Sequence, residues 1–127
     1  MSKLVGITIG DTKGIGIYIL IDCWKKNKIK NFILFKDLKK IINILKKTNI
    51  FNKVNIITSK TNLNFDKSKF NIVNYKSKSL EENTYKSLEI AYNYCKEKIC
   101  IGVITLPLRK DLIKSKIDKK FIGHTEF

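Results

Sequence analysis

Three glycines stand within seven positions in the stretch ITIGDTKGIG, residues 7–16. An apolar run that ends in a glycine-rich turn and leads into a helix brings backbone N–H groups and a helix N-terminus to a phosphate. The same glycines also suit a tight turn, because glycine adopts positive φ without steric cost. From these residues alone, a phosphate-binding loop and a plain turn are equally good interpretations.

A second set of candidate residues lies at the other end of the sequence. His124, the single histidine, stands beside Thr125 in the run GHTE, after Gly123. Arg109 and Lys110 follow a predicted buried strand, which is where α/β proteins bind ligands. A histidine, a hydroxyl group, two cations and a glycine that permits close backbone approach suit an anionic, phosphate-bearing small molecule.

The elements that must position these residues follow from the hydrophobic pattern. Apolar runs of strand length occupy 4–9, 31–35, 54–58, 70–75 and 100–108. Helical patterns lie between several of them, over 17–26, after the predicted N-cap Asp37, and from the Ser79/Glu82 capping box to about residue 98. This alternation predicts an α/β fold with a mostly parallel sheet flanked by helices.

Helical spacing also predicts which face each helix buries. The predicted apolar faces are Ile17, Leu20, Ile21 and Trp24 in the first helix; Leu38, Ile41, Ile42 and Leu45 in the second; and Tyr85, Leu88, Tyr92 and Cys95 in the third. Glu81 and Glu82 fall in the first turn of the third helix, where negative charge is favourable without any catalytic role.

The chain of 127 residues carries a formal net charge of +15, which raises the possibility of a basic nucleic-acid-binding module. However, only Arg109 among the 26 basic residues is an arginine, the residue that recognises phosphate and bases in bidentate fashion. The lysines are spread over nearly every segment. We therefore expect a diffuse positive field and no specific nucleic-acid partner.

Cysteine spacing and hydropathy indicate a compartment. Cys23, Cys95 and Cys100 form no C-x-x-C pair, so neither a disulfide framework nor a thiolate metal site is expected. No leader-like segment and no apolar run long enough for a membrane span is evident. These features predict a cytoplasmic protein that does not insert into a membrane.

One dehydrogenase pattern fits the glycines in part. Gly10, Gly14 and Gly16 match the G-x-x-x-G-x-G arrangement of short-chain dehydrogenases, and Tyr94 with Lys98 matches their Y-x-x-x-K pair. That family places its tyrosine much further along the chain, so we interpret Tyr94 as an ordinary helix residue. A short-chain-type NAD(P)-binding fragment remains an alternative.

Both ends of the sequence resemble a different family. The run GVITLPLRKDLIKSKIDKKFIGHTEF, residues 102–127, is similar to the "ALVTGPINK … FPGHTE" region of 4-hydroxythreonine-4-phosphate dehydrogenase, the PdxA family of vitamin B6 biosynthesis. The opening stretch is similar to that family's "ITMGDPAGIGPE". The order and spacing of the two regions agree with the family.

The resemblance implies an isocitrate/isopropylmalate dehydrogenase-like fold and NAD-dependent oxidation of 4-phosphooxy-L-threonine, followed by decarboxylation to 3-amino-2-oxopropyl phosphate. It further implies a homodimer, a divalent metal (Zn, Mg or Co) and substrate contacts by His124 and Thr125. Lys110 matches the motif lysine, to which no role is assigned. Catalytic and cofactor-binding residues are not assigned.

Departures from the family pattern limit what this sequence can do. Family members are more than twice as long, and their three metal-binding histidines lie beyond GHTE, so this chain holds none of the metal ligands. Leu106 replaces the glycine of the family's TGP, and Thr12 replaces a proline of the first motif. We therefore expect residues 1–127 to form the N-terminal part of an incomplete α/β dehydrogenase that is inactive alone.

Overall fold

The computed structural model of the protein describes residues 3–9, 15–58, 60 and 63–106. In this part of the chain, one sheet of five parallel strands has the order β3–β4–β2–β1–β5. The strands are β1 (Leu4–Ile9), β2 (Phe32–Lys36), β3 (Val54–Ile57), β4 (Phe70–Asn74) and β5 (Cys100–Leu106). The helices are α1 (Ile15–Lys25), α2 (Ile42–Lys47) and α3 (Leu80–Lys96), with short 3-10 turns at Leu38–Lys40 and Phe51–Lys53. The predicted α/β class with a parallel sheet is confirmed.

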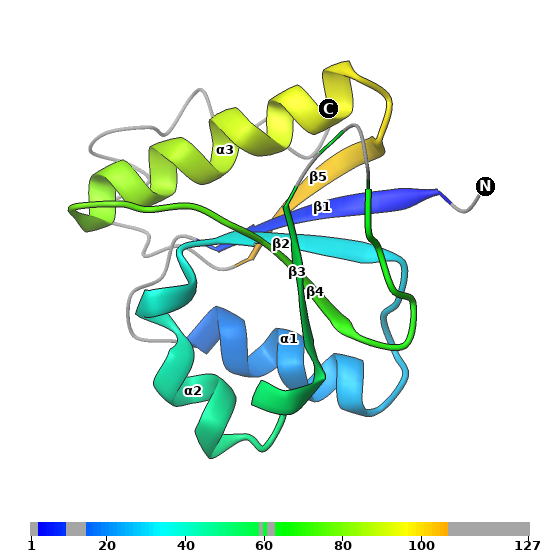
Figure 1. Ribbon diagram of the computed structural model, residues 1–127, viewed down its shortest axis with the longest axis vertical. Coiled ribbons are helices and arrows are strands. Elements are labelled where there is room, and N and C mark those ends of the chain that lie inside the picture. The colour runs from blue at the N-terminus through cyan, green and yellow to red at the C-terminus, as the bar shows by residue number, and fades with distance from the viewer. Residues whose placement is uncertain (1–2, 10–14, 59, 61–62, 107–127) are drawn as a thin grey trace.

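The sheet lies between two layers of helix. Figure 1 shows α1 and α2 below the sheet and α3 above it. Right-handed crossovers require this arrangement, because α1 leads from β1 to β2 in one direction and α3 leads from β4 to β5 in the other. The direction of the chain therefore reverses at the neighbouring strands β1 and β5.

Each face of the sheet has its own hydrophobic core. Beneath α1 and α2, the ring of Phe70 meets Trp24 and Phe32 edge to face, at centroid distances of 5.4 and 5.5 Å. Beneath α3, Phe35 and Tyr94 make a similar contact at 5.0 Å. Edge-to-face contacts of this kind add to the free energy gained by burying the rings.

The predicted buried face of α1 is confirmed, but the helix begins two residues earlier than the predicted residue 17. Ile17, Leu20 and Ile21 are buried and Trp24 packs against them. The helix begins at Ile15, so Gly16 is a helical residue rather than the end of the turn. Gly16 lowers the stability of the helix only a little, because packing of the apolar face of α1 against the sheet contributes more to helix stability than intrinsic propensity does.

The segment after Asp37 is capped as predicted but is not one helix. Asp37 accepts a hydrogen bond from the backbone N–H of Lys39 at 3.1 Å, which caps a single 3-10 turn. Ile41, with φ of −126°, then separates this turn from α2. Ile41 and Leu45 are buried, whereas Leu38 is half-buried.

The predicted buried face of α3 is wrong. Tyr85 and Tyr92 are 68% and 50% exposed, and Leu88 and Cys95 are half-buried. The residues buried against the sheet are Asn83, Ser87, Ala91 and Tyr94. A helix that crosses β2, β1 and β5 must approach the strands closely, which favours small side chains at its centre and leaves large ones on its flanks.

The described residues of the connection from β3 to β4 include no helix and are held by asparagines. The Asn55 side-chain amide donates to the carbonyl of Asn64 at 2.6 Å and to the side-chain oxygen of Asn71 at 2.8 Å. The Asn64 amide donates back to the carbonyl of Ile56 at 2.9 Å. These bonds place the loop against β3 and cover the outer edge of that strand.

Gly6 packs too closely against Phe35 to accept a side chain. A Cβ atom at Gly6 would lie 2.8 Å from Cε2 of Phe35, which is fully buried. We predict that Gly6→Ala lowers the free energy of unfolding by about 1–3 kcal/mol, as overpacking does in other cores. Chemical denaturation followed by circular dichroism measures this change.

The control for this prediction removes the obstructing ring. In a Phe35→Leu background, Gly6→Ala should cost clearly less than in the wild-type background, because the clash is with the ring edge. Equal costs in both backgrounds would contradict the steric explanation.

Candidate functional site at the carboxyl edge of the sheet

Parallel sheets bind ligands where the carboxyl ends of their strands meet, at the point where the strand order reverses direction. In this protein that point lies between β1 and β5. Their register pairs Thr8 with Thr105 and Ile9 with Leu106. The two segments that resemble the dehydrogenase motifs continue from these two strands.

A hydroxyl pair joins the two strands at this edge. The Thr8 and Thr105 side-chain oxygens lie 2.8 Å apart, although the residues are 97 positions apart in sequence. Thr8 is fully buried, so this bond gives its hydroxyl group a partner away from water. The pair holds the ends of β1 and β5 together. The sequence did not indicate either threonine, because nothing local to an apolar strand points to a partner so far away.

Lys36 is a third residue that the sequence did not indicate. It ends β2 and is only 3% exposed. Its amino group donates to the carbonyl oxygen of Ile9, the last residue of β1, at 3.4 Å. A basic side chain is thus buried at the same edge, against Ile9, the residue that precedes Gly10.

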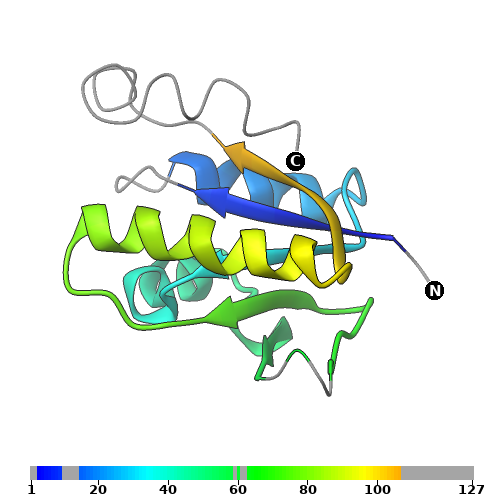
Figure 2. The same ribbon diagram turned by 90° about the horizontal axis from the view of Figure 1, so that it is seen from above.

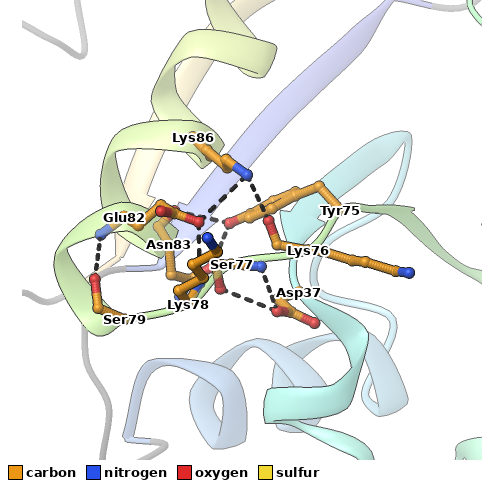
Figure 3. Close-up of polar contacts among 9 residues, drawn as sticks. All are labelled: Asp37, Tyr75, Lys76, Ser77, Lys78, Ser79, Glu82, Asn83 and Lys86. Atoms are coloured by element: carbon orange, nitrogen blue, oxygen red, sulfur yellow. Dashed lines mark hydrogen bonds and ion pairs between the residues drawn. The ribbon is translucent and has the colours of Figure 1, made fainter.

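Asp37 joins the loops that follow β2 and β4. One carboxylate oxygen caps the 3-10 turn, and the other accepts hydrogen bonds from the Ser77 backbone N–H and hydroxyl, both at 2.9 Å. Asn74 adds a parallel link, since its side-chain oxygen accepts from the backbone N–H of Leu38 at 2.8 Å. Figure 3 shows Asp37 facing Ser77 within this network. The cap was predicted, whereas its tertiary partner was not.

The start of α3 extends the same network (Figure 3). Ser79 accepts from the Glu82 backbone N–H at 3.1 Å, which confirms the predicted cap. The Glu82 carboxylate accepts from the Lys78 backbone N–H at 3.0 Å, and this bond lowers the pKa of Glu82. The amino group of Lys86 forms an ion pair with the Glu82 carboxylate one helical turn earlier, with 3.3 Å between the nitrogen and the oxygen.

A half-buried tyrosine completes the network on the side of the sheet. The Tyr75 hydroxyl group donates to the carbonyl oxygen of Asn83 at 2.9 Å. Burial raises the pKa of Tyr75, so the phenol stays protonated at neutral pH. The Lys86 amino group donates to the carbonyl of Lys76 at 2.8 Å on the outer side. These contacts hold the β4–α3 loop against the start of α3.

The candidate residues expected from the sequence belong to the segments that follow β1 and β5. His124, Thr125, Arg109 and Lys110 lie outside the described residues, as do Gly10, Asp11 and Gly14. The structure brings the strands that precede these two groups side by side.

Tyr94 occupies a core position. It is 4% exposed and packs on Phe35, and burial raises its pKa, the opposite of what an acid–base tyrosine requires. Lys98 lies beyond the end of α3, with φ of 64°. The interpretation of Tyr94 as an ordinary helix residue is confirmed, and the Y-x-x-x-K match has no catalytic geometry.

The described residues do not fit a metal site. They contain no group of three or more His, Cys, Asp or Glu side chains that could hold an ion. The described helices also include none that is long and apolar enough to cross a membrane.

The comparison with known proteins rests on structure. No protein-family model and no curated protein matches the sequence. The fold is similar to a solved structure from Salmonella typhimurium, described as a proposed 4-hydroxythreonine-4-phosphate dehydrogenase, with a TM-score of 0.66 and 17% identity. The match covers 90% of this chain and 40% of the Salmonella chain. Over that span, the two chains share a fold.

The Asp37 contacts predict a large local contribution to stability. Asp37→Ala removes a cap and leaves two Ser77 donors without their charged acceptor, so we expect a loss of about 2–3 kcal/mol. Asp22→Ala is the matched control, because Asp22 is an exposed partner of Lys26 at 3.1 Å and should cost less than about 0.5 kcal/mol. Urea denaturation of both variants measures the difference, and similar small losses would contradict the role of Asp37.

The thiols near the end of α3 should be inert. Burial raises the pKa of Cys100 to about 12 and also raises that of Cys95. A pKa of about 12 leaves a thiolate fraction about a thousand-fold below that of an ordinary thiol at pH 8. Iodoacetamide should therefore label Cys100 extremely slowly in the folded protein and rapidly in urea, as mass spectrometry would measure. Rapid labelling of the folded protein would contradict this account.

Proposed function

We propose that this chain forms the substrate-binding edge of a dehydrogenase of the 4-hydroxythreonine-4-phosphate type. The observation that carries the proposal is the pairing of β1 with β5 through Thr8 and Thr105. This pairing starts the two family-like segments from adjacent strand ends, although they are far apart in sequence. The fold shared with the Salmonella protein supports the same interpretation.

The chain's own residues would bind and orient a phosphorylated substrate. The Thr8–Thr105 hydroxyl pair fixes the ends of β1 and β5 relative to each other. The hydrogen bonds of Asp37 fix the loop between β4 and α3. Lys36 adds a basic group at the same edge, which favours an anion. In the proposal, His124 and Thr125 make the direct substrate contacts.

The proposed cofactor is NAD, which when bound accepts a hydride from the secondary alcohol of the substrate. The described residues do not make up a metal site. We also propose that the protein acts in the cytoplasm.

We predict that the chain binds 4-phosphooxy-L-threonine at the carboxyl edge and not elsewhere. In an NMR titration, the amide signals of Thr8, Ile9 and Thr105 should shift, while those of Leu4 and Cys100 at the opposite edge should not. His124→Ala should weaken binding about ten-fold or more, the loss of a charged hydrogen bond. Asn52→Ala is the matched control and should leave binding unchanged.

No turnover is expected from the chain alone, even with NAD and divalent metal added. Absorbance at the wavelength of reduced nicotinamide measures this directly. Turnover would contradict the expectation that this chain is inactive alone. Amide shifts confined to residues away from the carboxyl edge would contradict the proposed binding site.

A further inference from the structure

A cleft lies between the end of α2 and the start of β3. Its volume is about 300 Å³, at the lower end of the range for small-molecule sites, and it is lined by Lys46, Asn49, Phe51 and Asn52. Phe51 and Asn52 belong to the 3-10 turn that directly precedes β3. The cleft is therefore at the amino end of the sheet, away from the proposed substrate site.

The turn that ends α2 fixes the backbone of this cleft. Asn49 follows the helix with φ of 62°, a left-handed conformation that asparagine tolerates. Its backbone N–H donates to the Lys46 carbonyl at 3.1 Å, and the Ile50 N–H donates to the Leu45 carbonyl at 3.0 Å. Ile50 and Leu45 are both buried in the core beneath α1 and α2. These contacts are those of a Schellman motif, so the turn is formed before any ligand binds.

Phe51 supplies an aromatic ring to the cleft. Its side chain is 40% exposed, whereas Phe32, Phe35 and Phe70 of the strands are buried. The amino group of Lys46 lies 5.3 Å from the centroid of the Phe51 ring. A cation over an exposed ring is held only weakly, so a planar ligand can take its place on the ring.

The polar groups around the ring favour an anionic ligand. Lys46, Lys47 and Lys53 lie within residues 38–65, a segment that contains no Asp or Glu. The two asparagine side chains of the cleft each offer hydrogen-bond donors and an acceptor, the groups that recognise the edge of a base. A ring for stacking, a cation and carboxamide groups together match a nucleotide.

We propose that this cleft binds a free purine mononucleotide. The base stacks on Phe51, the asparagine amides bond to its edge, and the phosphate binds the amino group of Lys46. A nucleic-acid strand would need further rings for its successive bases, and the cleft is lined by one. The proposal does not depend on the dehydrogenase function, because it uses no residue of the carboxyl edge.

An NMR titration with adenosine 5′-monophosphate tests the proposal. The amide signals of Asn49, Phe51 and Asn52 should shift and saturate, with a dissociation constant of about 1 mM or below. Phe51→Leu keeps an apolar side chain but removes the ring, so the dissociation constant should rise about ten-fold or more. Lys46→Met should weaken binding of the nucleotide about five-fold or more and leave the binding of adenosine, which has no phosphate, unchanged.

Two substitutions on α3 are the matched controls. Tyr85→Leu removes an aromatic ring that is 68% exposed, and Lys96→Met removes a lysine from the last turn of that helix. Each should change the dissociation constant less than about two-fold, as for surface substitutions away from a site. Circular dichroism checks that all four variants fold.

Ribose 5-phosphate separates a specific site from the diffuse positive field of the chain. Without a base it should bind about ten-fold or more weakly than the nucleotide. Equal affinities for the two, an affinity that Phe51→Leu leaves unchanged, or binding of oligoadenylate RNA without binding of the mononucleotide would each overturn the proposal. 4-Phosphooxy-L-threonine also lacks a base and should leave the amide signals of Asn49 and Phe51 in place, so this proposal and the dehydrogenase proposal fail separately.

Discussion

The burial of β2 on both faces is the constraint on which the rest of the fold depends. All five of its residues are buried, so helices must cover the sheet on both sides. Right-handed crossovers meet this requirement only when the chain runs in opposite directions on the two faces. This reversal makes β1 and β5 neighbours and creates the switch point at their carboxyl ends (Figure 2).

Polar contacts then fix the geometry at that edge. The Thr8–Thr105 pair joins β1 to β5, and Asp37 joins the loops that follow β2 and β4. Thr8 and Asp37 are buried, and a buried polar group that loses its partner is costly. These contacts fix the described part of the carboxyl edge before any ligand binds, which lowers the entropic cost of binding there.

The sequence predicted the positions of strands and helix caps better than the buried faces of the helices. The strand from Leu4 to Ile9 has the predicted bounds, and Ser79 and Asp37 cap as expected. The third helix was misjudged because hydrophobicity favoured Tyr85 and Tyr92, whereas close approach to three strands selected Ser87 and Ala91. A helical pattern identifies amphipathicity, but steric fit against the sheet chooses the side that is buried.

By itself, the sequence determined the α/β class, the parallel sheet and the two chemistry-bearing segments, because these depend on local periodicity and spacing. It could not determine that Thr8 faces Thr105, that Lys36 reaches Ile9 or that Asp37 holds Ser77. Those contacts join residues from 27 to 97 positions apart. Only the strand order brings such residues together, and strand order follows from packing the whole sheet rather than from any one segment.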